Sequence, residues 1–537
     1  MLEKLIERWL DEANERVFQI PFCFALTKQG YTVVHLSRHT AMELGKDILA
    51  IDPTGTPCAF QLKGTTNGRL SLSKYRDDVQ PQLNDLVFGS IVHPSINPNV
   101  PHRSFLVVNG ILEEEVQRSI DDFNRARARE VPNRQLETIV RGELFEMFKN
   151  VAMEFWPTDA FNLKTFLELH IDKGDGQLPK DKFCQLIESS LPLVQQEGET
   201  PSHREATLQF LGAAIITALS LRTFTQKENH VAEVEGWTLL CSYILLGAEK
   251  WNLPPNCWKP AIDVALLRVY SLLGELLAEV TAKTHLVSGS PMSDFPVHRI
   301  RVTHLVGLMS IYGLWRRQLD EADKKEDALV KQFCNKYSSK LVLWGEYALP
   351  QFLAYHLYQR IVDATIKPEL FLYSIIDGII KNNVDRRKGN LGLPNPYYAA
   401  EDILPFLYEL TPKRLNDSFV GSSYGLEAFV HLFIRTNQKN RMKSLWPDFT
   451  KLSISEVRPE KKWDFYLWRL KQGENTTTLV TPRQNWTDLW NLALESSGSG
   501  IPELIKDFPI LYLLLIMGMP HRLNSSGVRW IATKLKP

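Results

Sequence analysis

Three residues in the segment 30–64 have types and spacing that could support hydrolytic chemistry. Asp47 opens one short apolar stretch, and Gln61 and Lys63 occupy alternate positions in the next one. Carboxylate, amide and carbonyl oxygens are the ligands that Mg²⁺ prefers, and the ion keeps several waters besides. A metal-bound water has a lowered pKa, and a lysine ammonium beside it can stabilise the charge that builds on a phosphodiester during hydrolysis.

The two stretches, residues 47–52 and 58–63, are expected to be the strands of one hairpin. The loop between them, PTGTP, has the glycine and prolines typical of a turn. If Asp52 pairs with Cys58, Asp47 lies opposite Lys63, and both share a face with Gln61. The other face is apolar and suited to pack on a helix; it carries Ile48, Ala50, Cys58, Phe60 and Leu62. The alternative interpretation is a surface hairpin on which Asp47 and Lys63 form a solvated ion pair.

The elements around the hairpin indicate an α/β domain over residues 1–150. Further strand-like stretches are YTVVHL at 31–36 and SFLVVNG at 104–110. Helical patterns cover residues 2–18 and 111–129, and Pro21 is well placed to open a short helix between them. The expected fold is therefore α/β at the amino end.

The rest of the chain has a different texture. Residues 151–201 contain polar, turn-rich stretches and are expected to form a linker or transitional segment. From 202 to 537 the apolar residues recur with the helical period, which predicts a large all-α region. A turn-rich stretch at 388–396 marks a candidate division within it. No repeat of fixed period is present, so a solenoid has no support.

Composition bounds the function classes. The chain has 537 residues, 44% of them hydrophobic, with 62 basic and 62 acidic side chains. A zero formal charge means that any nucleic-acid site must be a local patch. Six cysteines without a CxxC pair indicate reduced thiols and a cytoplasmic protein. We expect no secretory signal and no membrane partner, and the longest apolar run, 509–519, reads as a buried helix because it is too short for a bilayer.

The order of these motifs resembles the PD-(D/E)XK nuclease superfamily, in particular the restriction-endonuclease-like branch typified by Mrr, in which glutamine replaces an acidic residue. The matching motifs lie within residues 1–150 and are Gly30-Tyr31, Gly45-Lys46-Asp47-Ile48 and Gln61-Leu62-Lys63-Gly64. The resemblance implies an endonuclease that uses Mg²⁺ (or Mn²⁺) and cleaves DNA. Asp47 would be a metal ligand, Gln61 would belong to the metal shell, the Leu62 carbonyl would supply a neutral ligand, and Lys63 would be the catalytic lysine.

The family also places a glutamate on its first helix. Counting back from Gly30 puts Gln19 at that position, so the match fails there. Glu15, one turn earlier on the same helical stripe, is the candidate carboxylate, with Glu12 behind it. This departure leaves open whether one or two metal ions are held.

Other polar residues near the hairpin could extend the site. His39 and Glu43 could line a groove or hold an outer-shell water, although a capped loop explains them equally well. Arg69, Lys74 and Arg76 could contact phosphates, with a solvated helix start as the alternative.

A second basic stretch occupies residues 434–471. It holds ten Lys and Arg against four Asp and Glu, interleaved with tryptophans and a tyrosine. Such a mixture can follow phosphates and stack bases, and the candidate contacts are Lys439, Arg441, Lys461 and Lys462. An exposed helical face above buried tryptophans is the alternative.

Two functions from different classes follow. The first is a Mg²⁺-dependent endonuclease, acting on DNA rather than RNA, whose helical region senses, regulates or oligomerises. In the family it resembles, such fusions imply bacterial antiviral defence or restriction. Because the chain has no GxxxxGK[ST] motif, a nucleotide-driven step would need a separate sensor or NTPase subunit. The second is a non-catalytic scaffold with a degenerate nuclease fold that binds nucleic acid or protein.

Overall fold

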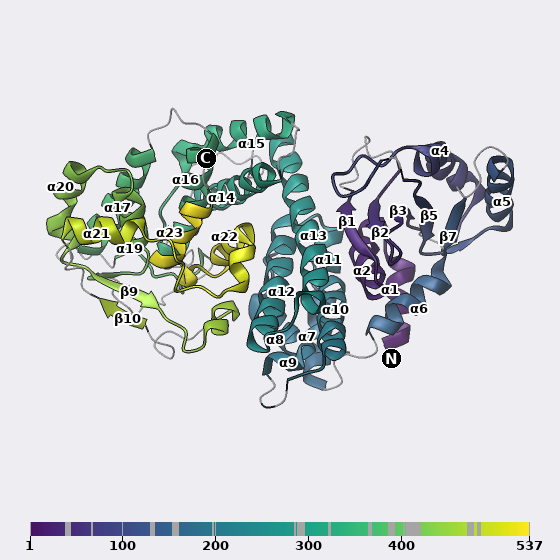
Figure 1. Cartoon of the computed structure of the whole chain (residues 1–537), viewed down its shortest axis with the longest axis horizontal. Helices are drawn as coiled ribbons and strands as arrows, with labels where there is room; N and C mark the ends of the chain where they lie inside the picture. Colours follow the sequence, from purple (N-terminus) through teal and green to yellow (C-terminus); the bar gives the residue numbers. More distant parts are fainter. Residues whose placement is uncertain are drawn as a thin grey trace. The chain divides into compact units, whose positions relative to one another are not determined.

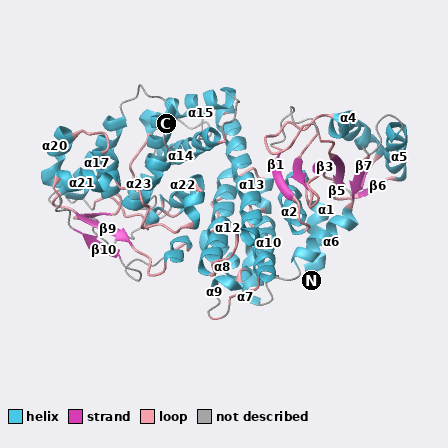
Figure 2. Cartoon of the chain, in the orientation of Figure 1, coloured by secondary structure: helices cyan, strands magenta, loops and turns pink. Residues whose placement is uncertain are grey.

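The computed structural model describes most of the chain, and it divides into two units. The described residues are 2–37, 45–65, 68–98, 100–128, 135–152, 160–195, 198, 200–283, 286, 296–319, 324–362, 368–384, 392–400, 403, 420–469, 477–480 and 485–535. The units are Met1–Glu275 and Leu276–Pro537. A mixed sheet lies in the first, and helices dominate the remainder, as expected from the change in apolar period (Figures 1 and 2).

A five-stranded sheet is the centre of the amino-terminal part. Its order is β1 (Thr32–Leu36), β2 (Ile48–Ile51), β3 (Pro57–Lys63), β5 (Arg103–Val108) and β7 (Leu136–Ile139). The first three strands are antiparallel, whereas β3, β5 and β7 run parallel. A short parallel pair, β4 (Arg69–Leu70) and β6 (Ile111–Leu112), stands beside it.

Helices cover both faces of this sheet. On the face of Leu49 and Ala59, the core is completed by α4 (Gln80–Phe88) and α5 (Glu114–Ala128). On the other face, Phe60 stacks on Phe105 at 4.7 Å and meets Phe22 of α2 edge-on at 5.5 Å. A strand buried on both faces reads as a nearly continuous apolar run, as β3 does.

The first two helices differ from their expected bounds. The expected helix 2–18 is two helices, α1 (Leu2–Glu12) and α2 (Glu15–Lys28), because Asn14 caps a new one by accepting the Val17 N–H at 3.0 Å. Pro21 lies inside α2 and does not open a helix. An interior proline costs about 3 kcal/mol, but α2 has ten buried residues between the sheet and α10, and this burial offsets the cost.

The helical part of the first unit begins earlier than the sequence indicates. Its helices are α6 (Arg141–Ala152), α7 (Ala160–His170), α8 (Lys180–Ser190), α9 (Pro192–Gln195), α10 (His203–Ser220), α11 (Arg222–Gln226), α12 (His230–Lys250) and α13 (Pro255–Ala282). Within the expected linker 151–201, α7 and α8 pack on α10, and α8 also packs on α12. The boundary between the two units falls inside α13, after Glu275.

Two strongly apolar helices belong to the interior. Helix α12 is long and apolar enough to cross a membrane, alone among the described helices, yet 89% of its apolar window is buried inside the protein. Helix α22 (Pro509–Gly518) covers the longest apolar run and is buried from Pro509 to Met517, which confirms the expected buried helix.

The second unit combines helices with a small sheet. Its helices are α14 (Pro296–Gln318), α15 (Lys324–Tyr337), α16 (Leu349–Val362), α17 (Pro368–Val384), α19 (Leu426–Ile434), α20 (Lys439–Phe449), α21 (Trp486–Leu494), α22 and α23 (Ser525–Lys534). The sheet has the order β10 (Thr477–Val480), β9 (Ser453–Val457) and β8 (Ser422–Ser423). An all-α region is therefore wrong at these strands, where β9 buries Ile454, Ser455 and Val457 within the unit. The candidate division at 388–396 falls partly outside the described residues.

Candidate active site

The β2–β3 hairpin has the expected faces but a different register. Ile48 pairs with Phe60 and Ala50 with Cys58, which is two residues away from the expected pairing of Asp47 with Lys63. The reason is a tighter turn: the Asp52 carboxylate accepts the N–H groups of Thr54 and Thr56, both at 2.9 Å. A shift of two residues keeps every side chain on its face, so the shared face of Asp47, Gln61 and Lys63 survives.

Two carboxylates lie along one edge of β3. Asp47 Oδ2 accepts the Leu62 N–H at 2.6 Å, and Glu15 Oε1 accepts the Gly64 N–H at 3.2 Å. N–H groups two residues apart point to the same side of a strand and are about 6–7 Å apart. The Leu62 carbonyl points to the same side as its own N–H, because each residue of an extended strand directs both groups one way. Three oxygen groups of the expected metal site therefore share this edge.

The backbone of Asp47 is fixed from three sides. Its N–H donates to the Phe60 carbonyl at 2.8 Å, and its carbonyl accepts the Ser37 N–H at 2.8 Å. Gln19, which stands where the resemblance expects a glutamate, donates its side-chain amide to the same carbonyl at 3.2 Å. Gln19 thus holds the Asp47 backbone, whereas Glu15 holds the Gly64 N–H.

Gln61 is fully buried and has one polar atom without a partner. Its Nε2 donates to Gln82 Oε1 on α4, whereas its Oε1 has no hydrogen-bond partner in the described structure. A buried acceptor left unpaired costs free energy, on the order of 1–3 kcal/mol. A cation at this position would satisfy it.

Lys63 is the last residue of β3 and lies beside Glu15. Its side chain is 12% exposed, and its Nζ lies 4.0 Å from Glu15 Oε1. Lys74 comes close to the same point, because its Nζ donates to the Gly64 carbonyl at 2.7 Å. A cavity of about 620 Å³ opens here, and Glu15, Gly64 and Lys74 are in its wall.

Asn109 follows β5 directly and has a structural role. It is fully buried; its Nδ2 donates to the carbonyls of Leu10 at 2.8 Å and Ala13 at 2.7 Å, and its Oδ1 accepts the Thr65 N–H at 2.7 Å. It therefore fastens the α1–α2 turn, which carries Glu15, to the chain just after β3. The signal in the sequence is an Asn-Gly pair directly after an apolar strand.

The segment around α11 and the start of α12 also bonds to the α1–α2 turn. Arg16 Nη1 donates to Glu228 at 2.8 Å, and Arg222 Nη2 donates to Glu12 at 2.7 Å. These bonds occupy the Glu12 carboxylate, whose pKa is lowered by hydrogen bonds from Arg222 and then from Arg8. Glu12 is accordingly an ion-pair partner of the helical part and not a second site carboxylate.

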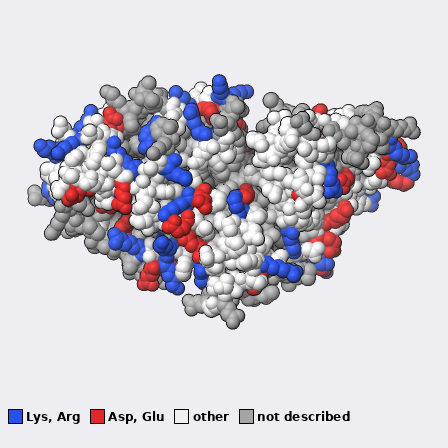
Figure 3. Space-filling model, viewed as in Figure 1, with Lys and Arg blue, Asp and Glu red and all other residues white. Residues whose placement is uncertain are grey.

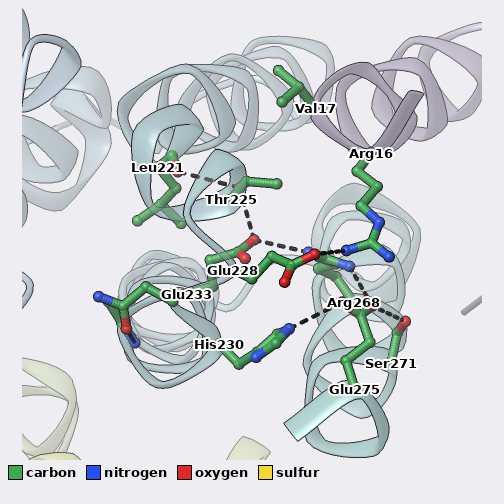
Figure 4. A network of polar contacts seen from close by, with 12 residues as sticks. Arg16, Val17, Leu221, Thr225, Glu228, His230, Glu233, Arg268, Ser271 and Glu275 are labelled. Atoms are coloured by element: carbon green, nitrogen blue, oxygen red, sulfur yellow. Dashed lines mark hydrogen bonds and ion pairs between the residues drawn. The ribbon is translucent and has the colours of Figure 1, made fainter. Parts of the chain in front are cut away.

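A buried ionic network stands behind that segment (Figure 4). Arg268 donates to Glu233 at 2.9 Å and to Glu275 at 3.0 Å, and its side chain is 3% exposed. Despite burial, the pKa of Glu275 is lowered to about 2, chiefly by the charge of Arg268 and the hydrogen bond from His230. The network joins α12 to α13 within the first unit.

The remaining candidates are not gathered at this site. Arg69 and Arg76 are exposed, and His39 and Glu43 lie outside the described residues. The candidates of the second basic stretch, Lys439, Arg441, Lys461 and Lys462, are exposed and belong to the second unit. Acidic and basic side chains are intermingled on the face drawn in Figure 3, in keeping with the zero formal charge.

The donor set fits Mg²⁺ better than a metal that prefers nitrogen or sulfur. No group of three or more His, Cys, Asp or Glu side chains that could hold a metal occurs among the residues that the structure describes. Mg²⁺ is held by one or two carboxylates and keeps several waters. Asp47 and Glu15 are two carboxylates beside the Leu62 and Gly64 N–H groups, and carboxylate and carbonyl oxygens are the donor types that Mg²⁺ prefers.

Compared with protein-family models, with curated proteins and with solved structures, the chain matches none.

Proposed function

We propose that this protein is a Mg²⁺-dependent endonuclease with a restriction-endonuclease-like amino-terminal fold, acting on DNA. The observation that carries the proposal is the shared edge of β3, where Asp47 and Glu15 accept the N–H groups of Leu62 and Gly64. The order of a helix, an Asp-bearing strand and a Gln-x-Lys strand is the order of motifs in the resemblance.

Each residue has a defined role in this proposal. Asp47, Glu15 and the Leu62 carbonyl would hold the ion, and the Gln61 oxygen would accept a bond from its shell. Bound Mg²⁺ would supply a water of lowered pKa and neutralise phosphate charge. Lys63, held beside Glu15, would place its ammonium against the attacked phosphate and stabilise the charge that develops there.

The cavity beside the site gives a place for the nucleic-acid backbone. It is about 620 Å³ in volume and has Lys74 in its wall, next to Gly64. A lysine at this position could pair with a phosphate adjacent to the one attacked. The backbone contacts would position the strand without reading its sequence.

A non-catalytic scaffold is the second candidate, and a specific observation favours it. Two positions that carry acids in the resembled family hold Gln19 and Gln61, and Gln19 already donates to the Asp47 carbonyl. A scaffold has no need of a metal, whereas a catalytic site must bind Mg²⁺ or Mn²⁺ through Asp47.

The test is a cleavage assay with the purified full chain on supercoiled plasmid, single-stranded DNA and RNA, each with Mg²⁺, Mn²⁺ or EDTA. Plasmid nicking or linearisation that needs the metal would support the proposal. Cleavage of RNA alone would show that the substrate is RNA and not DNA. Calorimetric titration of Mn²⁺ accompanies the assay. Folded protein that neither cleaves nor binds Mn²⁺ would favour the scaffold.

A further inference from the structure

The second unit contains a cavity of about 550 Å³ that the nuclease proposal does not use. Its wall is formed by β9, by the chain just after it, and by the start of α23. Sites for small organic molecules have volumes of about 300–1000 Å³. The cavity is therefore large enough for one such molecule.

The start of α23 forms one side of the cavity. Asn524 caps the helix by accepting the Gly527 N–H at 2.7 Å, and Asn524, Ser525 and Ser526 are each less than a tenth exposed. N–H groups of a first helical turn have no partner within the helix, and the helix dipole adds partial positive charge. This end of the cavity favours an anion.

A buried arginine stands one turn further along α23. Arg529 is 6% exposed and is part of the cavity wall. Its Nη1 lies 3.3 Å from Ser525 Oγ and 3.0 Å from His431 Nδ1, while its Nε has no hydrogen-bond partner in the part of the chain described. Burial and the charge of Arg529 lower the pKa of His431 to about 3, so the imidazole is neutral and its Nδ1 accepts the hydrogen bond from Arg529.

More positive charge lies nearby. Burial, together with the charges of Arg360 and Arg529, lowers the pKa of Arg435 to about 10. Arg360 and Arg435 direct their guanidinium groups to backbone carbonyls, including those of Ala532 and Ala493. The surroundings of Arg529 thus carry two further arginines whose hydrogen bonds go to neutral groups. Burial lowers the pKa of Arg529, and the charges of Glu495, Glu427 and Glu456 oppose this only in part.

The rest of the wall supplies two cations, two acids and an apolar surface. Arg458 forms an ion pair with Glu456 at 3.0 Å. Lys462, whose side chain is exposed, is the other cation of the wall. Glu427 is also present, and burial raises the pKa of its carboxyl. Ile454, Phe465 and Ile501 give the wall an apolar area. The complementary ligand has a doubly charged anionic group and an apolar or planar body.

We propose that this cavity binds a small organic phosphate. The phosphate lies at the start of α23, between Arg529 and Lys462, and the organic body lies against Phe465. A phosphomonoester carries a charge of about −1.5 to −2 near neutral pH, which matches two cations. The Glu427 carboxyl hydrogen-bonds Ser525 at the same end of the cavity, and burial raises its pKa.

The test is calorimetric titration of the full chain with three probes: phenyl phosphate, adenosine 5′-monophosphate and inorganic phosphate. Lys462→Glu is the main variant, because an exposed side chain can be reversed in charge without disturbing the fold. Lys461→Glu, its exposed neighbour outside the cavity wall, is the matched control. Arg529→Gln is the second variant, with circular dichroism to check that it folds.

We expect one site per chain for an organic phosphate, weakened about tenfold or more by Lys462→Glu and unchanged by Lys461→Glu. Equal weakening by both lysine variants would show only a surface charge effect and would overturn the proposal. So would the absence of binding to folded wild-type protein at millimolar probe. Inorganic phosphate that binds as tightly as both organic probes would overturn the role of the organic body. None of these results depends on cleavage activity.

Discussion

The ammonium of Lys63 lies 4.0 Å from the carboxylate of Glu15. The two residues are far apart in sequence, one at the end of β3 and the other at the first position of α2. Their side chains are 12% and 31% exposed, so water screens the pair only in part. The lysine of the Gln-x-Lys strand and the first carboxylate of α2 therefore lie side by side.

Glu15→Gln tests the assignment of the helix carboxylate. The variant keeps an oxygen for the Gly64 N–H but loses the negative charge, so we expect Mg²⁺-dependent cleavage to fall about 10- to 100-fold with little loss of stability. Cleavage rates and Mn²⁺ titration measure the effect. Glu114→Gln, which removes an exposed glutamate paired with Arg118, is the control and should cleave like wild type. Wild-type cleavage by Glu15→Gln would exclude Glu15 from the site.

Gln61→Glu tests whether the unpaired amide oxygen faces the metal. A buried carboxylate without a partner is unfavourable, so with EDTA the variant should be less stable than wild type by about 1–3 kcal/mol. Mg²⁺ should raise its melting temperature more than it raises that of wild type, because the added charge tightens metal binding. Gln117→Glu, on the exposed face of α5, is the control. An equal response to Mg²⁺ in Gln61→Glu and wild type would contradict the placement.

The sequence predicted the two faces of the hairpin better than its register. Alternation of polar and apolar residues fixes which side chains share a face, and this held because the register differs by an even number of residues. The register itself depends on Asp52, whose bonds to Thr54 and Thr56 tighten the turn, and a turn-residue pattern does not reveal which residue closes it.

The tertiary contacts could not be predicted from the pattern. Asn109 joins the α1–α2 turn to the chain after β3, a contact across about a hundred residues that leaves no periodic signal. Pro21 reads as a helix start from local preference, but packing of α2 between the sheet and α10 keeps it inside a helix. Within residues 151–201, the helices α7 and α8 likewise depend on their contacts with α10, which local sequence preference does not reveal.

Arg268→Met tests the buried network of Figure 4. It would leave Glu233 and Glu275 buried without their cation, which costs about 3–5 kcal/mol of unfolding free energy. Glu228→Gln removes the charge of an exposed carboxylate that pairs with Arg16. This variant should lose about 1 kcal/mol or less of unfolding free energy. Urea unfolding of both variants measures the difference. Equal losses would show that the network does not stabilise the first unit.

Glu346→Gln tests a buried carboxyl of the second unit. Burial raises the pKa of Glu346 to about 7, although its Oε2 accepts the N–H groups of Tyr424 at 2.7 Å and Gly425 at 3.1 Å. A raised pKa favours the folded state at low pH, and this contribution is lost as pH rises from about 4.5 through about 7. The unfolding free energy of wild type should therefore fall relative to that of Glu346→Gln over this range. Parallel pH profiles of the two proteins would contradict the assignment.

The most direct test of the nuclease account is Asp47→Asn in the plasmid-cleavage assay with Mg²⁺. The amide oxygen of asparagine can still accept the Leu62 N–H, so the fold should persist while the metal-binding charge is lost. Asp122→Asn, an exposed change on α5, is the matched control. The account predicts metal-dependent cleavage by wild type and the control, and a loss of about 100-fold or more in Asp47→Asn. Cleavage that persists at the wild-type rate in Asp47→Asn would contradict it.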